Sequence, residues 1–368
     1  MSIGELIRDL RQARGWSQGR LASAINDAFG TNLDREYVSR WERCKVKPGA
    51  YYLRCLSAVL DVPLAVLEDD VKRRTFLTDA AGAAIAPAVA SDLLSVGFAA
   101  RLRGGPSVDE WESKLDTYGT EYMSLGAADI QRRVSSELVV VQQQLENPRL
   151  WSVASRLMTL YAKTFPGADG AKAVNWYRLA AEAADESGDD QARVWVRGRA
   201  AIALGYEGAS LGVADVLADQ AMSISQKPSL GLLNAIYGKA HAAALRGDRG
   251  AALRLSEQGQ RVFDKAGSHE QTSDYAVPWW RVNVFRSLLL ARLGDERGAV
   301  EAQEAARREL PATLPRFATH LEMHRGLMLA RSGDRAGGVS YARGAMDALP
   351  PEKHSLTLRL LMAEVEAS

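Results

Sequence analysis

The apolar residues of this chain recur with the helical period of about 3.6 residues in two separate stretches. In the first stretch, Leu21 and Ala22 share one face of an expected helix, and Val38 and Trp41 share the inner face of the next helix. The second stretch begins near residue 111 and shows almost no alternation of β-branched and polar residues. The pattern therefore predicts an all-α protein.

The two N-terminal helices each follow a residue that is suited to capping a helix. Ser17 and Asp34 carry side-chain oxygens that can accept a hydrogen bond from a backbone N–H of the first turn. The second helix then displays a polar outer face made of Arg35, Glu36, Ser39 and Arg40. Two short capped helices joined by a turn, with arginines exposed on the second, are suited to entering a DNA major groove.

These residues resemble the helix-turn-helix of the Xre, Cro and phage-repressor superfamily. Gln18 matches the residue after the serine cap, and Val38 to Glu42 match the recognition-helix pattern, in which Ile or Val precedes Ser and an aromatic residue or Leu precedes Glu. Pro48 matches the proline before the fourth helix. The resemblance spans roughly residues 3–67 and implies that the arginine-bearing helix reads DNA.

Two positions depart from the family pattern. The segment from Asn26 to Leu33 makes the turn about six residues longer than the family minimum, which leaves the angle between the two helices open. Cys44 stands where the family has a glycine, at a position that favours positive φ. The resemblance implies that the arginines of the helix read base edges and that the basic residues after it hold phosphates. The expected DNA contacts are Gln18, Arg35, Glu36, Tyr37, Ser39, Arg40, Arg43, Lys45 and Lys47.

The charge is unevenly distributed along the chain. Residues 1–75 contain 13 Lys and Arg against 10 Asp and Glu, whereas the remainder contains 33 against 35. A mildly basic N-terminal part on a near-neutral body is typical of a sequence-specific regulator, because a protein that coats nucleic acid is strongly basic throughout.

The segment between the two stretches is expected to be a linker. Residues 73–77 and the apolar residues 80–89 look like a twin-arginine export signal, but they follow a folded domain instead of standing at the N-terminus. A linker helix with a basic start is the better interpretation, and Arg103 to Pro106 suggest a hinge. We expect a DNA-binding domain at residues 1–70, a linker helix and hinge at 71–110, and a sensor and dimerisation domain at 111–368.

A glycine followed by an aspartate recurs in the second stretch, at Gly247-Asp248, Gly294-Asp295 and Gly333-Asp334, with weaker copies of the turn at Gly188 and Gly208. The glycines of the three main copies are 47 and 39 residues apart. Glycine can end one helix in the left-handed conformation, and aspartate can cap the next. This turn resembles that of the tetratricopeptide repeat, whose helix hairpins stack to bury their apolar faces. We expect an α-solenoid of four or five tetratricopeptide-like hairpins between about residues 111 and 349, closed by a helix at Leu356–Glu366.

The first helices of these hairpins carry aromatic, amide and charged residues, and such helices usually line the concave face of a solenoid. Amide and phenol groups there can bind the backbone of an extended peptide. The alternative is that the tryptophans belong to the core and that the polar groups are solvated. The candidate effector-binding residues are Asn175, Trp195, Arg199, Asn234, Tyr237, His241, Trp280, Asn283, Arg286, His320 and His324. Lys239, Arg286 and Arg325, each eight residues before a turn glycine, form either an anion-binding stripe or contacts between helices.

Three further patterns give weak indications of chemistry. Residues 208–212 fit the G-x-S-x-G pattern of a nucleophile elbow, which requires a preceding strand where this sequence is helical. His320 and His324 are four residues apart, but no third metal ligand is evident. Cys44 and Cys55 form either a redox switch or a helix cap and a core residue. We expect no enzyme activity, no cofactor and no metal site.

Composition limits the class of protein further. Two cysteines in 368 residues provide no disulfide framework, and no apolar run is long enough to span a bilayer, so we expect a cytoplasmic protein without membrane contact. The chain is similar to Gram-positive quorum-sensing regulators, and its Ala-, Arg- and Gly-rich composition suggests an actinobacterial source. The resemblance implies a homodimer on a double-stranded DNA operator, with a peptide or small-molecule effector that changes operator affinity. The alternative is a protein-interaction scaffold whose repeats bind a partner protein and whose N-terminal domain localises it to DNA.

Overall fold

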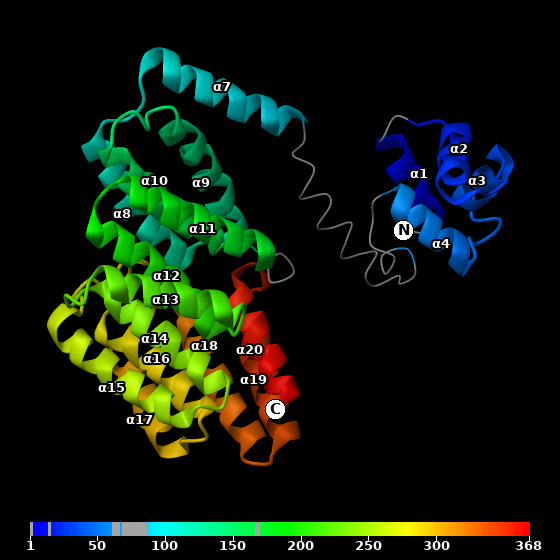
Figure 1. Ribbon diagram of the computed structural model, residues 1–368. Helices are drawn as coiled ribbons and strands as arrows, with labels where there is room; N and C mark the ends of the chain where they lie inside the picture. Colours follow the sequence, from blue (N-terminus) through cyan, green and yellow to red (C-terminus); the bar gives the residue numbers. More distant parts are fainter. Residues whose placement is uncertain (1–2, 14–15, 61–66, 68–86, 166–169) are drawn as a thin grey trace. The chain divides into compact units, whose positions relative to one another are not determined.

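The computed structural model describes residues 3–13, 16–60, 67, 87–165 and 170–368, and every regular element in these ranges is helical (Figure 1). The prediction of an all-α chain is therefore confirmed. The chain divides into two compact units, Met1–Ser91 and Asp92–Ser368. Within these ranges, no helix combines the length and the apolar character that a membrane crossing requires.

Residues 3–59 of the first unit form a bundle of four short helices, α1 (Ile3–Ala13), α2 (Gln18–Phe29), α3 (Arg35–Glu42) and α4 (Ala50–Val59). Their apolar faces meet in one core, to which α2 contributes Leu21 and Ala22 and α3 contributes Val38 and Trp41. All four side chains are buried, as the pattern of apolar residues predicts.

The predicted caps of α2 and α3 are both present. Ser17 Oγ accepts a hydrogen bond from the Arg20 backbone N–H at 3.1 Å, and Asp34 Oδ1 accepts one from the Tyr37 backbone N–H at 3.0 Å. The extra residues before α3 mostly lengthen α2, which ends at a left-handed Gly30 with a φ of 65°. The short turn that follows is fixed by Asn26, whose side chain exchanges two hydrogen bonds with the Leu33 backbone, at 2.7 and 2.8 Å.

The second unit is a stack of helices that follow one another in chain order (Figure 1). They are α7 (Pro87–Arg103), α8 (Val108–Ser124), α9 (Ala127–Gln142), α10 (Arg149–Ala162), α11 (Gly170–Glu186), α12 (Asp190–Glu207), α13 (Leu211–Ile224), α14 (Leu230–Leu245), α15 (Arg249–Ala266), α16 (Trp279–Arg292), α17 (Glu296–Glu309), α18 (Pro315–Arg331), α19 (Arg335–Asp347), the 3-10 helix η2 (Pro351–Lys353) and α20 (Leu356–Ala367).

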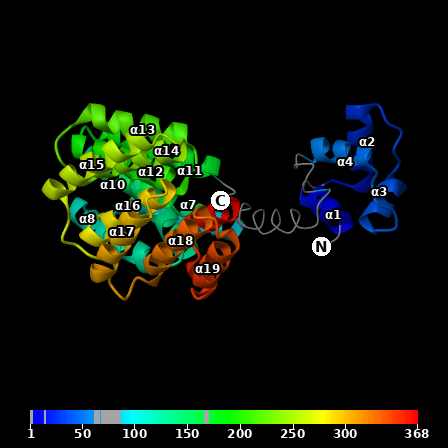
Figure 2. The ribbon, with the colours of Figure 1, turned by 90° about the horizontal axis from the view of Figure 1, so that it is seen from below.

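The helices from α8 to α19 form successive pairs, and α20 packs against α18 and α19 as the expected closing helix. The described residues contain six such pairs, so the expectation of four or five hairpins is too low. The glycine-aspartate signal marks only the later turns, because α8 begins with a Ser107–Glu110 capping box and α10 follows Pro148. Helices α12, α14 and α16 are buried on nearly all sides, whereas α13, α15 and α19 lie at the periphery (Figure 2).

The predicted geometry of the repeat turns is confirmed at each of the three main copies. Gly247, Gly294 and Gly333 have φ values of 81°, 69° and 106°, which are left-handed conformations that favour glycine. The aspartate after each glycine caps the following helix, with side-chain to backbone hydrogen bonds of 2.9, 3.0 and 2.9 Å. These local signals therefore fix where α15, α17 and α19 begin.

Helices α12 and α14 cross with their backbones in direct contact. A Cβ atom added at Gly198 or Gly205 would overlap the carbonyl oxygen of Gly231 or Gly238 respectively. Only glycine permits this separation, because any side chain at the crossing would push the two helices apart.

The segment that the sequence suggests as a hinge, from Arg103 to Pro106, joins α7 to α8 inside the second unit. Gln144 Nε2 donates a hydrogen bond to the Pro106 carbonyl oxygen at 3.0 Å, and Gln144 Oε1 accepts one from Trp111 Nε1 at 2.9 Å. The division between the two units instead falls after Ser91, within the first turns of α7. The expected basic start of the linker, residues 73–77, lies outside the described residues.

Candidate DNA-binding face and cationic pocket

Helix α3 presents a continuous polar surface. Its residues Arg35, Glu36, Tyr37 and Arg40 are exposed, and Ser39 is half-buried. The Arg40 guanidinium lies 3.7 Å from the Glu36 carboxylate and 5.7 Å from the centre of the Tyr37 ring. Both contacts are at the surface and hold Arg40 weakly, so its donors remain available to another partner.

The basic residues after α3 extend this surface. Arg43, Lys45 and Lys47 are all exposed in the loop between α3 and α4. We call these residues and the outer residues of α3 together the α3 face: Arg35, Glu36, Tyr37, Ser39, Arg40, Arg43, Lys45 and Lys47.

A buried ion pair joins α1 to the end of α3. Arg11 donates from Nε and Nη2 to the two carboxylate oxygens of Glu42, at 2.6 and 3.0 Å, and from Nη1 to the Trp16 carbonyl at 2.6 Å. Gln18 Nε2 also donates to Glu42, at 2.7 Å, so this candidate DNA contact is partly engaged within the first unit. The bidentate pair fixes the angle of α3 against α1 and α2. Sequence reasoning missed Arg11, although the final Glu of the recognition pattern was a signal for a partner.

Most of the candidate effector-binding residues are buried between helices instead of lining an open groove. Asn175 is exposed on α11, which is the second helix of its pair, so its expected place on a first helix is incorrect. Arg286 is half-buried and donates to Asn283 Oδ1 at 3.2 Å. The buried candidates are Trp195, Arg199, Asn234, Tyr237, His241, Trp280, Asn283, His320 and His324.

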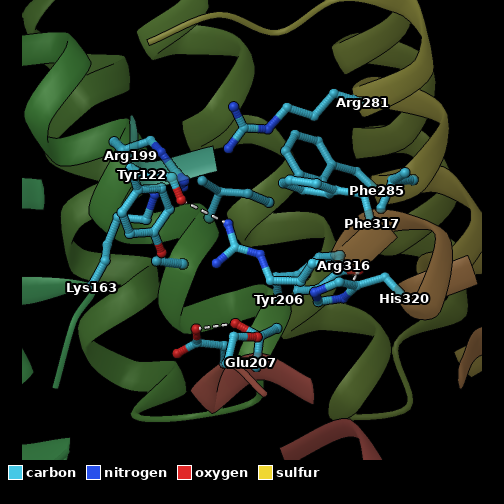
Figure 3. A pocket seen from close by; sticks show the side chains of 15 residues that line it. Tyr122, Lys163, Arg199, Tyr206, Glu207, Arg281, Phe285, Arg316, Phe317 and His320 are labelled. Atoms are coloured by element: carbon cyan, nitrogen blue, oxygen red, sulfur yellow. Dashed lines mark hydrogen bonds between the residues drawn. The ribbon is translucent and has the colours of Figure 1, made fainter. Parts of the chain in front are cut away.

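A pocket lies in the interior of the second unit and brings together side chains from α8, the end of α10, α12, α16, α18 and the start of α20 (Figure 3). We call it the cationic pocket. Of the candidate effector-binding residues, Arg199 and His320 line it. Its lining consists of Tyr122, Lys163, Arg199, Ile202, Ala203, Tyr206, Glu207, Arg281, Val284, Phe285, Arg316, Phe317, His320, Ser355 and Thr357.

A single carboxylate, Asp274, supports the cationic side of this pocket. Asp274 Oδ1 accepts from Lys163 Nζ at 2.5 Å and from Arg199 Nη2 and Arg281 Nη2 at 2.9 Å each. Burial opposes ionisation of this carboxyl group, but the three cations hold the pKa of Asp274 well below its ordinary value. Burial and the nearby Arg199 guanidinium hold the pKa of Lys163 well below its usual range.

The opposite side of the pocket carries Glu207, which accepts a hydrogen bond from the Thr357 hydroxyl at 2.6 Å. Burial raises the pKa of the Glu207 carboxyl, and the Thr357 hydrogen bond opposes that shift. Figure 3 shows the Arg316 guanidinium between Glu207 and Arg281. Arg316 Nη2 donates to the Tyr122 carbonyl at 3.0 Å, and its guanidinium lies 5.3 Å from the centre of the Tyr122 ring.

Buried histidines form a hydrogen-bonded chain beside the pocket. Tyr206 Oη lies 2.9 Å from His324 Nε2 and 3.4 Å from His320 Nδ1, and His324 Nδ1 lies 2.9 Å from Ser287 Oγ. The two histidines four residues apart on α18 thus bond to Tyr206. Among the described residues, no group of three His, Cys, Asp or Glu side chains could hold a metal ion.

The G-x-S-x-G segment does not have the local structure of a nucleophile elbow. Ser210 adopts a left-handed conformation with a φ of 52°, but the element before it is the helix α12 rather than a strand. The basic column also has structural partners. Lys239 pairs with Asp219 on α13, and the Arg325 guanidinium lies 5.8 Å from the centre of the Tyr341 ring on α19. These contacts favour the interpretation that the column joins helices.

Three comparisons relate this chain to known proteins. Residues 7–67 match the family model described as Helix-turn-helix. No curated protein matches the chain. Among solved structures, the chain is similar to PlcR of Bacillus thuringiensis, solved in complex with the peptide PapR7 and DNA, at 16% sequence identity and a TM-score of 0.36. That alignment covers 72% of this chain and 95% of the PlcR chain. The first unit thus contains an Xre-type helix-turn-helix domain at residues 7–67, as predicted, and a helical-repeat unit follows it.

Proposed function

We propose that this chain is a cytoplasmic, sequence-specific transcription regulator that binds operator DNA as a homodimer and whose second unit binds a peptide or small-molecule effector. The observation that carries the proposal is the α3 face on a helix-turn-helix domain. Arginine in the major groove pairs bidentately with guanine, and basic residues beside the recognition helix pair with phosphates. Two cysteines in 368 residues provide no disulfide framework, which supports the cytoplasm as the compartment.

The effector part of the proposal rests on the cationic pocket, which includes Arg199 and His320 from the residues expected to bind an effector. A ligand regulates DNA binding only if it binds one arrangement of the protein better than another. A coupling free energy of about 1–3 kcal/mol would change operator affinity about 5- to 150-fold.

The test compares two variants of the α3 face in the full-length protein, on an operator selected from random DNA by the wild type. We expect Arg40→Ala to lose about 1–3 kcal/mol of discrimination between operator and random DNA, because it removes a contact to a base edge. We expect Lys45→Ala to weaken binding to both DNAs alike and to lower the salt slope by about one, because it removes a phosphate contact. Fluorescence anisotropy at several salt concentrations measures both effects.

The control is Arg132→Ala, which removes an exposed arginine from α9 in the second unit. Its affinity for both DNAs should equal that of the wild type. If Arg40→Ala keeps the wild-type preference for the operator, α3 does not read the bases in the way proposed.

A further inference from the structure

The cationic pocket is surrounded by more positive than negative charge. Two carboxylates, those of Asp274 and Glu207, face four cationic side chains, those of Lys163, Arg199, Arg281 and Arg316. Three of the cations share one oxygen atom of Asp274. A buried surplus of positive charge is costly unless a further anion compensates it.

Two of the arginines also have hydrogen-bond donors without a partner. The Nε atoms of Arg199 and Arg281 are buried and make no hydrogen bond within the chain. Both side chains are more than nine-tenths buried and line the pocket. A buried donor without a partner costs about 1–3 kcal/mol of stability. A ligand acceptor that bonds to these donors would remove this cost, and the gain would favour binding.

The rest of the lining limits the kind of anion. Phe285, Phe317 and Tyr206 supply aromatic walls beside the guanidinium groups (Figure 3). Glu207, on the other side of Arg316, repels a second negative charge and can accept a hydrogen bond from a ligand. A group with one negative charge, a planar face for arginine and an apolar body fits these walls better than a multiply charged phosphate.

We propose that the cationic pocket binds the carboxylate of a ligand with an apolar or aromatic body, either a small carboxylic acid or the C-terminus of a peptide. The carboxylate pairs with Arg316, Arg199 and Arg281, and the apolar body packs against Phe285 and Phe317. That this ligand is the effector rests on the proposed function. The binding site itself rests on the geometry of the second unit.

A second cavity lies beside the cationic pocket. It shares the lining residues Tyr122, Lys163, Arg316, Ser355 and Thr357 with the pocket. It adds Lys353 and Arg359, whose positive charges extend the cationic lining. These two side chains add to the positive potential around the cationic pocket, which favours an anion there.

The test uses matched pairs of probes that differ only in charge. Line broadening in 19F NMR reports binding of 4-fluorobenzoate and of 4-fluorobenzamide to the full-length protein. We expect the benzoate to bind at least tenfold more tightly than the amide. N-acetyl-Leu-Phe with a free C-terminus and the same peptide with a C-terminal amide then compete with the benzoate. If the acid peptide displaces 4-fluorobenzoate at a lower concentration than unlabelled benzoate does, the ligand is a peptide C-terminus. If the acid peptide requires a higher concentration, the ligand is a small carboxylic acid.

A second experiment compares benzoate binding by two variants, Arg316→Gln and Arg325→Gln. Arg325→Gln is the control, because it makes the same change on the same helix outside the cationic pocket. Arg316 is half-buried, so its replacement disturbs the core less than that of the buried Arg199. We expect Arg316→Gln to weaken benzoate binding at least tenfold and Arg325→Gln to change it less than twofold. If Arg316→Gln does not fold by circular dichroism, Arg316→Lys, which keeps the charge but loses the planar fork, should weaken binding at least threefold.

Three results would overturn the carboxylate site. They are an absence of benzoate binding, equal binding of benzoate and benzamide, and tighter binding of phenylphosphonate than of benzoate. DNA affinity is measured on the same samples by anisotropy. If benzoate binds in the pocket but no carboxylate probe changes DNA affinity, the site stands and its role as the effector site fails.

Discussion

At the residue scale, Cys44 shows how one position carries the strain of a helix end. It follows α3 with a φ of 56°, a conformation that costs a residue with a Cβ atom about 1–2 kcal/mol. Its backbone N–H donates to the Trp41 carbonyl at 3.0 Å, and the next N–H donates to the Arg40 carbonyl at 2.9 Å, so the chain cannot relax without losing these hydrogen bonds. The sequence predicted this conformation because the related domains have glycine at this position.

We therefore expect Cys44→Gly to stabilise the end of the recognition helix by about 0.5–1 kcal/mol, after the entropic cost of glycine is subtracted. Hydrogen exchange of the α3 amides in the full-length protein, followed by mass spectrometry, should slow about two- to fivefold. Cys44→Ala is the control, because it removes the thiol but keeps the Cβ atom. Equal exchange in the two variants would mean that φ is not the source of the strain.

At the element scale, the sequence predicted the features that local signals specify. Ser17, Asp34 and the glycine-aspartate turns act within a few residues, so their positions could be read from the chain. The cationic pocket could not be predicted from the sequence, because Lys163 and Asp274 are separated by 111 residues and meet only through tertiary packing. Asp274 lies in the long connection between α15 and α16, where no repeat pattern marks it.

The crossing of α12 and α14 gives a prediction about two glycines of the second unit. Gly198→Ala places a Cβ atom against the Gly231 carbonyl oxygen and forces the helices apart. We expect it to lower the free energy of unfolding by about 1–3 kcal/mol or more, as overpacking does elsewhere. Urea unfolding of the full-length protein, followed by circular dichroism, measures this change.

The matched control for that variant is Gly212→Ala in the first turn of α13. A Cβ atom at Gly212 would meet nothing within 4 Å, so alanine there should stabilise the helix by about 0.5–1 kcal/mol. Similar effects of the two substitutions would show that helix propensity, and not the close crossing, dominates at Gly198.

At the scale of the whole molecule, α7 offers a surface for assembly. Leu94, Phe98 and Leu102 are spaced four residues apart on α7 and are 64%, 68% and 82% exposed, so they form an apolar stripe that the described residues of the second unit leave uncovered. We expect Phe98→Glu to shift the proposed homodimer to monomer and Val96→Glu, on the other side of the same helix, to leave it unchanged. Light scattering at micromolar concentration measures the mass, and a dimeric Phe98→Glu would exclude this stripe as the interface.

The buried histidines make the stability of the second unit depend on pH. Burial, together with nearby Arg316 and Arg281, lowers the pKa of His320 to about 3, and burial holds the pKa values of His241 and His324 well below the ordinary 6.5. The unfolded chain therefore binds protons below pH 6.5 that the folded chain does not bind. The contribution of these histidines to the free energy of unfolding is fully present above pH 6.5 and is lost as the pH decreases toward 3.

Each such histidine contributes a slope of about 1.4 kcal/mol per pH unit, so the three together give about 4 kcal/mol per unit at most. Urea unfolding at pH 7.5 and pH 5.5 should show this loss. His320→Gln should reduce the slope by about one third, and His269→Gln, which changes an exposed histidine, should leave it unchanged. A slope that His320→Gln does not alter would assign the pH dependence to other groups.

The connection between α15 and α16 has a consequence for how the second unit unfolds. Stacked repeats usually lose their structure one at a time, because each contacts only its neighbours. Here the Asp274 backbone N–H donates to the Gly119 carbonyl of α8 at 2.8 Å, and its carboxylate bonds to the end of α10, to α12 and to α16. The loop joins an early repeat to a late one, so α8 and α16 cannot separate without breaking these contacts of Asp274. We expect a single cooperative transition, in which the repeats are stable only as a closed set.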